Sequence, residues 1–147
     1  MNEFDLLINK ELRDNTIERV EILEQVKEIL TLGTTDFVTV EMASQYYDVS
    51  MRHIKRCISE NRKELELYGL KTYSYYEIKE LIKGDINNTV KIPISGITVM
   101  SKGALLRIGM LLRDSGVAKE IRTRLLDIVY DAETKTDIVN NVVNEII

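Results

Sequence analysis

The segment over residues 38–63, VTVEMASQYYDVSMRHIKRCISENRK, constrains the fold of this chain more than any other. It predicts two short helices joined by a tight turn, because Thr39 can cap the first helix and Ser50 the second. Asp48 and Val49 interrupt the helical pattern, and Val49 is expected to lie buried beneath both helices. This arrangement is typical of a helix-turn-helix, whose second helix enters the major groove of DNA.

The second helix of this pair has an apolar face and a polar face. Met51, Ile54 and Ile58 recur at helical spacing, with Cys57 beside them, and are expected to face inward. The outward side chains are basic or form hydrogen bonds, and arginine can make a bidentate pair with guanine. We therefore expect the helix over residues 50–62 to read the major groove. The residues predicted to bind DNA are Ser50, Arg52, His53, Lys55, Arg56, Ser59, Asn61, Arg62, Lys63 and, outside this helix, Lys91.

A merely solvated helix face is the alternative interpretation, because charged residues are ordinary on the outer side of an amphipathic helix. Between positions 50 and 64, however, five basic residues stand against two acidic ones, Glu60 and Glu64. This excess, together with the two capped helices and the short turn, favours DNA binding.

The net charge of -4 does not exclude a nucleic-acid partner, because the acidity is local. Residues 1–32 hold eight acidic and four basic side chains, which gives -4 and leaves the rest of the chain neutral. A nearly neutral domain would bind DNA weakly as a monomer. A homodimer would bind more strongly, since it presents two recognition helices at once.

Composition narrows the class of protein. With 30% charged residues, 44% hydrophobic residues and one proline, the chain is expected to be helix-rich and globular. A single cysteine excludes an internal disulfide, and Cys57 is expected in the core rather than as a nucleophile. The sequence has neither an apolar run of membrane-spanning length nor a signal peptide, so we expect a cytoplasmic protein without a membrane partner. Motifs for metal, nucleotide and acyl-transfer chemistry do not occur, which predicts no enzymatic activity, metal or cofactor.

The whole pattern predicts a mainly α fold with a small β-hairpin, in which a winged helix-turn-helix-like core is followed by C-terminal helices. Residues 1–15 are expected to form an N-terminal arm and residues 16–116 the core. A first helix is expected over residues 16–32. Alternating apolar residues on both sides of Pro93 predict a hairpin within residues 85–100, which could act as a wing on DNA or close the core.

Other local signals complete this core. Short strands are expected near residues 37–40 and 71–73, and Ser74 opens a helix with a capping box. Ser101 is expected to cap a helix over residues 102–113, which is apolar nearly all round and should be buried.

Residues 117–147 form an amphipathic region with an apolar helical stripe. Such a stripe leaves apolar surface exposed unless another copy covers it, which predicts a homodimer contact. The residues predicted at this contact are Val117, Ile121, Leu125, Ile128, Ile138, Val142 and Ile146.

Two segments in order, TVEMASQYYDVSMRHIKRCISENRKEL and ITVMSKGALLRIGMLLRDSGVAKEIRTRLLDI, resemble the N-terminal DNA-binding modules of phage-encoded regulators. These modules belong to the antirepressor group that includes BRO-type and Rha-type domains, and the resemblance covers roughly residues 17–130. It implies transcriptional control of phage or mobile-element genes. Such proteins typically carry a further C-terminal effector or oligomerisation domain, so we expect this chain to be a short relative or a fragment.

Two functions remain open from the sequence. The first is a sequence-specific double-stranded DNA-binding transcriptional regulator. The second is an antirepressor-like interaction module that binds a repressor or host protein. Alanine substitution of Arg52 and Arg56 separates them, because only a DNA reader should then lose DNA binding.

Overall fold

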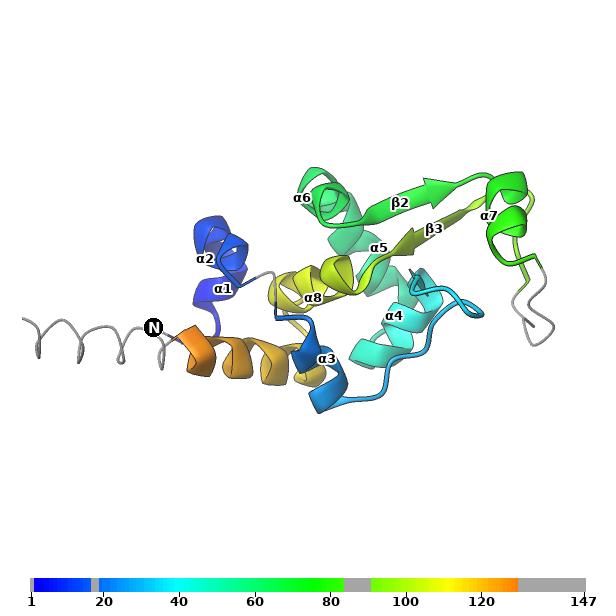
Figure 1. Ribbon diagram of the computed structural model, residues 1–147. Helices are drawn as coiled ribbons and strands as arrows, with labels where there is room; N and C mark the ends of the chain where they lie inside the picture. The colour runs from blue at the N-terminus through cyan, green and yellow to red at the C-terminus, as the bar shows by residue number, and fades with distance from the viewer. Residues whose placement is uncertain (1, 17–18, 84–90, 130–147) are drawn as a thin grey trace, which may run out of the picture.

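The computed structural model describes residues 2–16, 19–83 and 91–129 of the 147 residues. They are mainly helical with one small antiparallel sheet, which confirms the predicted fold class at this level (Figure 1). None of the helices in this part of the chain combines the length and apolar character needed to cross a membrane. The elements are α1 (Asp5–Ile8), α2 (Lys10–Asp14), α3 (Glu21–Val26), β1 (Val38–Thr39), α4 (Val40–Tyr47), α5 (Met51–Glu60), α6 (Arg62–Leu67), β2 (Leu70–Tyr73), α7 (Tyr75–Leu81), β3 (Ile97–Met100), α8 (Lys102–Leu111) and a further helix over residues 116–129.

Four helices begin at the caps predicted from the sequence. The hydroxyl groups of Thr39, Ser50, Ser74 and Ser101 each accept a hydrogen bond from the backbone N–H three residues later. Glu77 also accepts from the Ser74 N–H, which completes the predicted capping box. Local side-chain chemistry therefore determines where α4, α5, α7 and α8 start.

The sheet has the strand order β1-β3-β2, so the last strand in sequence is central. Both neighbours pair with it in antiparallel fashion, and Met100 lies opposite Val38 on one side and Leu70 on the other. The short strands predicted near residues 37–40 and 71–73 are thus confirmed, as β1 and β2.

Of the hairpin predicted within residues 85–100, the second strand is present as β3, but the first strand is absent from its described residues. Residues 91–96 form no strand, and the Gly96 N–H donates to the Pro93 carbonyl at 3.0 Å in a turn. Because Pro93 has no N–H to contribute to a ladder, this segment is a poor partner for β3. β3 pairs instead with β1 and with β2, and all residues of β2 are in register with it. Residues 84–90 of the predicted hairpin lie outside the described residues.

The first predicted helix, over residues 16–32, is also corrected, because α3 ends at Val26. Lys27 is extended, with φ -162° and ψ 149°. Its ammonium group donates to the backbone carbonyls of Gln45 and Tyr46 at 2.8 and 3.0 Å. Those carbonyls belong to the last turn of α4, where a helix has acceptors without intrahelical partners and favours a cation. The chain therefore leaves the helical conformation at Lys27, where the Lys27 side chain contacts the end of α4.

The core is built around α8, where every position from Ala104 to Met110 is buried, as its apolar sequence predicted. The same cluster contains Leu6 from α1 and Ile121 and Leu125 from the 116–129 helix, none with exposed surface. The predicted N-terminal arm and the start of the predicted C-terminal region thus pack in the same core as α8.

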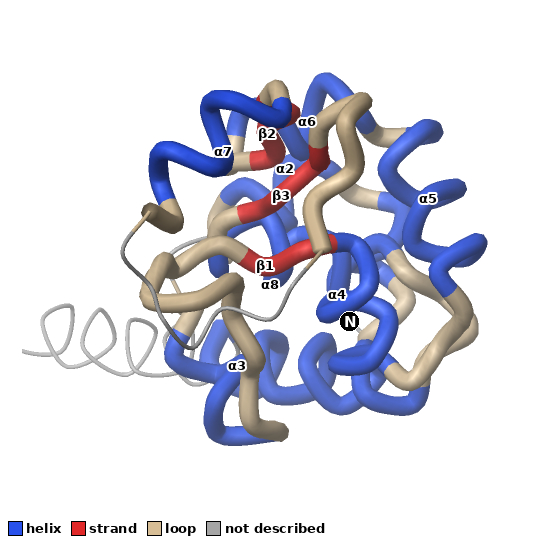
Figure 2. Tube along the Cα trace, turned by 90° about the vertical axis from the view of Figure 1, so that its right-hand side faces the viewer, coloured by secondary structure: helices blue, strands red, loops and turns tan. Residues whose placement is uncertain are grey.

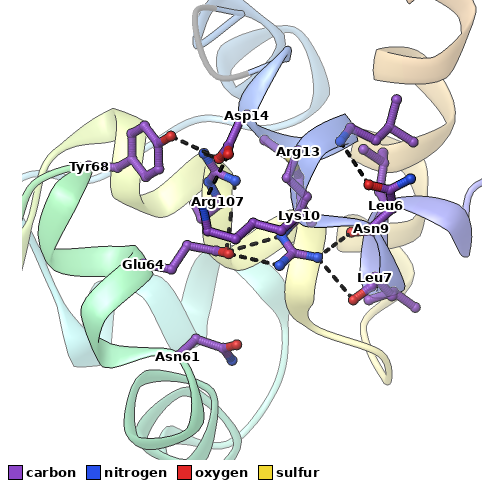
Figure 3. Close-up of polar contacts among 12 residues, drawn as sticks. Leu6, Leu7, Asn9, Lys10, Arg13, Asp14, Asn61, Glu64, Tyr68 and Arg107 are labelled. Atoms are coloured by element: carbon purple, nitrogen blue, oxygen red, sulfur yellow. Dashed lines mark hydrogen bonds and ion pairs between the residues drawn. The ribbon is translucent and has the colours of Figure 1, made fainter.

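A buried cluster of charged side chains joins α2, α6 and α8 (Figure 3). The Arg13 guanidinium donates two hydrogen bonds to the Glu64 carboxylate, at 3.0 and 2.7 Å. Arg107, which has no exposed surface, lies 3.8 Å from the same carboxylate and 2.9 Å from Asp14. The guanidinium of Arg107 also stacks 3.9 Å from the centre of the Tyr68 ring. This cluster fixes α6, the helix that directly follows α5.

Arg122, a second buried arginine, ties the 116–129 helix to the end of α8. Its Nη1 donates to the carbonyls of Gly109 and Leu112 at 3.0 and 2.7 Å. These carbonyls lie in the last turn of α8 and at its C-cap, so the cation satisfies acceptors that the helix itself cannot. Its Nε donates to Glu3 at 2.6 Å, which neutralises the buried charge. The 116–129 helix therefore belongs to the same folded body.

Candidate nucleic-acid interface

The predicted helix pair is present as α4 and α5. Asp48 ends α4 in the left-handed conformation, with φ 53°, which permits the tight turn between the helices. Val49 in this turn is partly buried against the main core, as predicted. The turn thereby positions Ser50 to start the second helix.

One face of α5 is buried in the core and the other is exposed to solvent. Ile54, Cys57 and Ile58 are at most 6% exposed, whereas Met51, predicted to face inward, is 38% exposed at the first turn. Figure 2 shows α5 along one edge of the molecule, away from α7. The fold thus leaves the outward face of α5 accessible. The predicted DNA-binding residues exposed on or directly before α5 are Ser50, Arg52, His53, Lys55, Arg56 and Ser59.

The continuous helix predicted over residues 50–62 ends at Glu60. Asn61, with φ -131° and ψ 27°, interrupts it before α6 begins at Arg62. The Asn61 side-chain amide donates to the Cys57 carbonyl at 2.9 Å, so this nitrogen is engaged inside the protein. Arg62 and Lys63 remain exposed, but they belong to a separate helix.

The surface of α5 is more basic in the folded chain than the local sequence count suggests. Glu64 is turned inward to Arg13, so it does not offset the exposed bases. Arg62 lies 3.5 Å from Glu66 in an exposed ion pair. Glu60 is the acidic residue of α5 itself. Among the described residues, no carboxylate lies within 4.0 Å of the charged groups of Arg52, Lys55, Arg56 and Lys63.

His53 is held by the residue that caps its helix. Ser50 Oγ accepts from the His53 backbone N–H at 3.4 Å and lies 2.8 Å from Nδ1 of the imidazole. This contact fixes the ring at the start of α5, beside the basic face.

A pocket of about 250 Å³ lies along one side of α5. His53, Arg56 and Glu60 line it from α5, and Arg113 and Asp114 line it from the turn after α8. Sequence reasoning did not select Arg113, whose only signal was a basic residue at the end of an apolar helix.

The Cys57 thiol also borders this pocket but is chemically inert. Burial, and to a smaller extent the nearby carboxylate of Glu60, raises the pKa of Cys57 to about 12. The thiol therefore stays protonated at neutral pH, which agrees with the predicted role as a small core residue.

In the parts of the chain that the structure describes, no three His, Cys, Asp or Glu side chains gather as a metal site. Comparison with protein-family models, with curated proteins and with solved structures finds no match to this chain. The indication of function therefore comes from the geometry and charge of the surface itself.

Lys91 does not belong to the α5 surface. It is exposed and precedes Ile92, which is buried in a second apolar cluster with Ile78, inside α7, and Ile82, the C-cap of α7. Figure 2 shows α7 on the opposite side of the view from α5. A contact of Lys91 with DNA would need a different part of the duplex from the one that α5 contacts.

The structure corrects the predicted dimer contact for those of its residues that lie in the described part of the chain. Ile121 and Leu125 have no exposed surface and lie in the main core, so they cannot meet a second chain. Val117 and Ile128 are partly buried against the same core. The chain covers this apolar stripe itself because the stripe packs with α8. The remaining predicted contact residues, Ile138, Val142 and Ile146, lie outside the described residues.

Proposed function

We propose that this protein is a sequence-specific double-stranded DNA-binding transcriptional regulator that reads the major groove with α5. The observation that carries the proposal is the outward face of α5, on which Arg52, Lys55 and Arg56 are exposed and unpaired among the described residues. Basic side chains without partners attract phosphates and can reach base edges. They are presented by a helix that is capped at its start and packed on a core along its other face.

The dimensions of α5 suit a groove. Its ten residues span about 15 Å at about 1.5 Å per residue, and the major groove of B-DNA is about 12 Å wide. At helical spacing, Arg52 and Ser59 occupy the middle of the exposed face, and Lys55 and Arg56 lie on either side of it. We assign base-edge contacts to the middle of the face and phosphate contacts to its sides.

The arrangement of strands supports a winged helix-turn-helix as the finer description. One strand precedes the helix pair, a second follows it after α6, and the third lies between them in the sheet. The connection from β2 to β3 contains α7 and takes the place of the simple hairpin expected from the sequence. In this proposal the sheet and α7 support the helix pair, and α5 is the reading element.

Dimerisation remains part of the proposal, because a chain with a net charge of -4 gains affinity for DNA by engaging two half-sites. The dimer contact cannot use Ile121 or Leu125, because both are buried in the core.

The test is selection of duplexes from a random pool, followed by affinity measurements with the selected duplex. The double variant Arg52→Ala, Arg56→Ala should weaken binding by about 1–3 kcal/mol through the lost base-edge contact of Arg52, and further through the lost phosphate contact of Arg56. Lys79→Ala is the matched control, since Lys79 is exposed on α7, which Figure 2 shows on the opposite side of the view from α5. An antirepressor-like module that binds a repressor or host protein would instead select no duplex, and both variants would behave alike.

A further inference from the structure

The pocket beside α5 brings together hydrogen-bond donors from two elements that are far apart in sequence. His53 and Arg56 come from α5, and Arg113 comes from the turn that follows α8. Because α5 packs on α8, the position of Arg113 relative to α5 is set by the core rather than by a loose tail. The volume of about 250 Å³ is open to a group the size of a phosphate.

The contact with Ser50 occupies Nδ1 of His53, which leaves Nε2 as the ring nitrogen that can contact a group in the pocket. Ser50 Oγ already accepts from the His53 backbone N–H, so its own hydrogen is free to be donated to Nδ1, at 2.8 Å. When Ser50 donates to Nδ1, the neutral ring carries its hydrogen on Nε2. With Nδ1 held by Ser50, Nε2 is the ring nitrogen left to donate to a group in the pocket.

The pocket is not simply a positive patch. Glu60 and Asp114 line it together with Arg56 and Arg113, so their formal charges cancel. An anion in this pocket would be held by directed hydrogen bonds from imidazole and guanidinium groups and opposed by two exposed carboxylates. Affinity in the pocket should therefore rise when a carboxylate is neutralised.

A helix that lies in the major groove has a phosphate strand on each flank. On the flank of α5 that faces α8, the pocket is where such a strand would pass. We propose that a backbone phosphate of the bound duplex occupies this pocket and accepts hydrogen bonds from His53, Arg56 and Arg113. This inference rests on the proposed function and adds to it a contact from outside the helix pair.

The experiment measures affinity for the selected duplex and for an unrelated duplex over a series of salt concentrations. Arg113→Ala should weaken binding to both duplexes by a similar factor and lower the slope of log K against log salt by about 0.9, the value for one phosphate. Lys79→Ala, which removes one exposed positive charge on α7, should change the slope by much less. Asp114→Asn should tighten binding to both duplexes. Circular dichroism of each variant checks that the fold is intact.

The outcomes separate the two proposals. If Arg52→Ala weakens binding but Arg113→Ala behaves like Lys79→Ala, the pocket does not hold a phosphate and the DNA-binding function stands. If Arg113→Ala affects the selected duplex only, Arg113 contacts a base and the phosphate assignment is overturned. If the wild-type protein binds no duplex at low salt, both proposals fail.

Discussion

The side chain of Tyr47, at the end of α4, lies directly against Gly109 in the last turn of α8. A Cβ at position 109 would lie 2.5 Å from the Tyr47 hydroxyl oxygen and 3.2 Å from two ring carbons. Tyr47 is completely buried, and its hydroxyl donates to the Leu105 carbonyl. The absence of a side chain at position 109 therefore allows the first helix of the pair to seat on the central helix.

Gly109→Ala should destabilise the protein by about 1–3 kcal/mol, because the added methyl group overpacks this contact. Urea denaturation measures the effect. Gly116→Ala is the matched control, since a Cβ at that position meets nothing within 4 Å, and it should stay within about 0.5 kcal/mol of the wild type.

Tyr47→Phe removes the atom closest to the added methyl group. The cost of Gly109→Ala should therefore be smaller in the Tyr47→Phe background, with a coupling of at least about 0.5 kcal/mol. Equal costs in the two backgrounds would show that the hydroxyl does not set this helix spacing.

Glu64→Gln should destabilise the fold by about 3–5 kcal/mol, the usual cost of removing one partner from a buried ion pair. The neutral amide would leave the charge of Arg13 uncompensated inside the protein and would remove one of the two carboxylates beside Arg107. The control is Glu66→Gln, whose exposed pair with Arg62 should contribute less than about 1 kcal/mol. A loss no larger than that of Glu66→Gln in urea denaturation would contradict the structural role given to this cluster.

Asp14 should make stability depend on acid pH. Hydrogen bonds from Lys10, and then from Tyr68 and Arg107, lower the pKa of Asp14 from 3.8 to about 2 in the folded protein. The folded state favours the Asp14 carboxylate over the acid. The contribution of this carboxylate to the free energy of unfolding is therefore complete above pH 3.8 and is lost as the pH falls through about 2.

Denaturation midpoints of the wild type and Asp14→Asn test this dependence. The wild type should be the more stable at neutral pH, and the difference should shrink as the pH falls from about 4 to about 2. A difference that stays constant over this range would show that ionisation of Asp14 is not coupled to folding.

Local chemistry explains what the sequence predicted well. The hydroxyl groups of Thr39, Ser50, Ser74 and Ser101 act on backbone groups three residues away, so the starts of four helices are readable without knowledge of the fold. The division of α5 into a buried and an exposed face follows from helical periodicity in the same way, apart from Met51 at its start. These features were enough to place the candidate reading helix and most of its outward residues.

The sequence by itself thus determined the helix pair and the chemistry of its outer face, because both depend on residues within a few positions of one another. Only the tertiary structure decided that α3 ends before Lys27, that β1 and β2 flank β3, and that Glu64 points inward to Arg13. The tertiary structure also decided that Arg113 lies beside α5 and that Ile121 is buried in the core. Each of these depends on partners distant in sequence, whose free energies of contact outweigh local preference and cannot be read from periodicity.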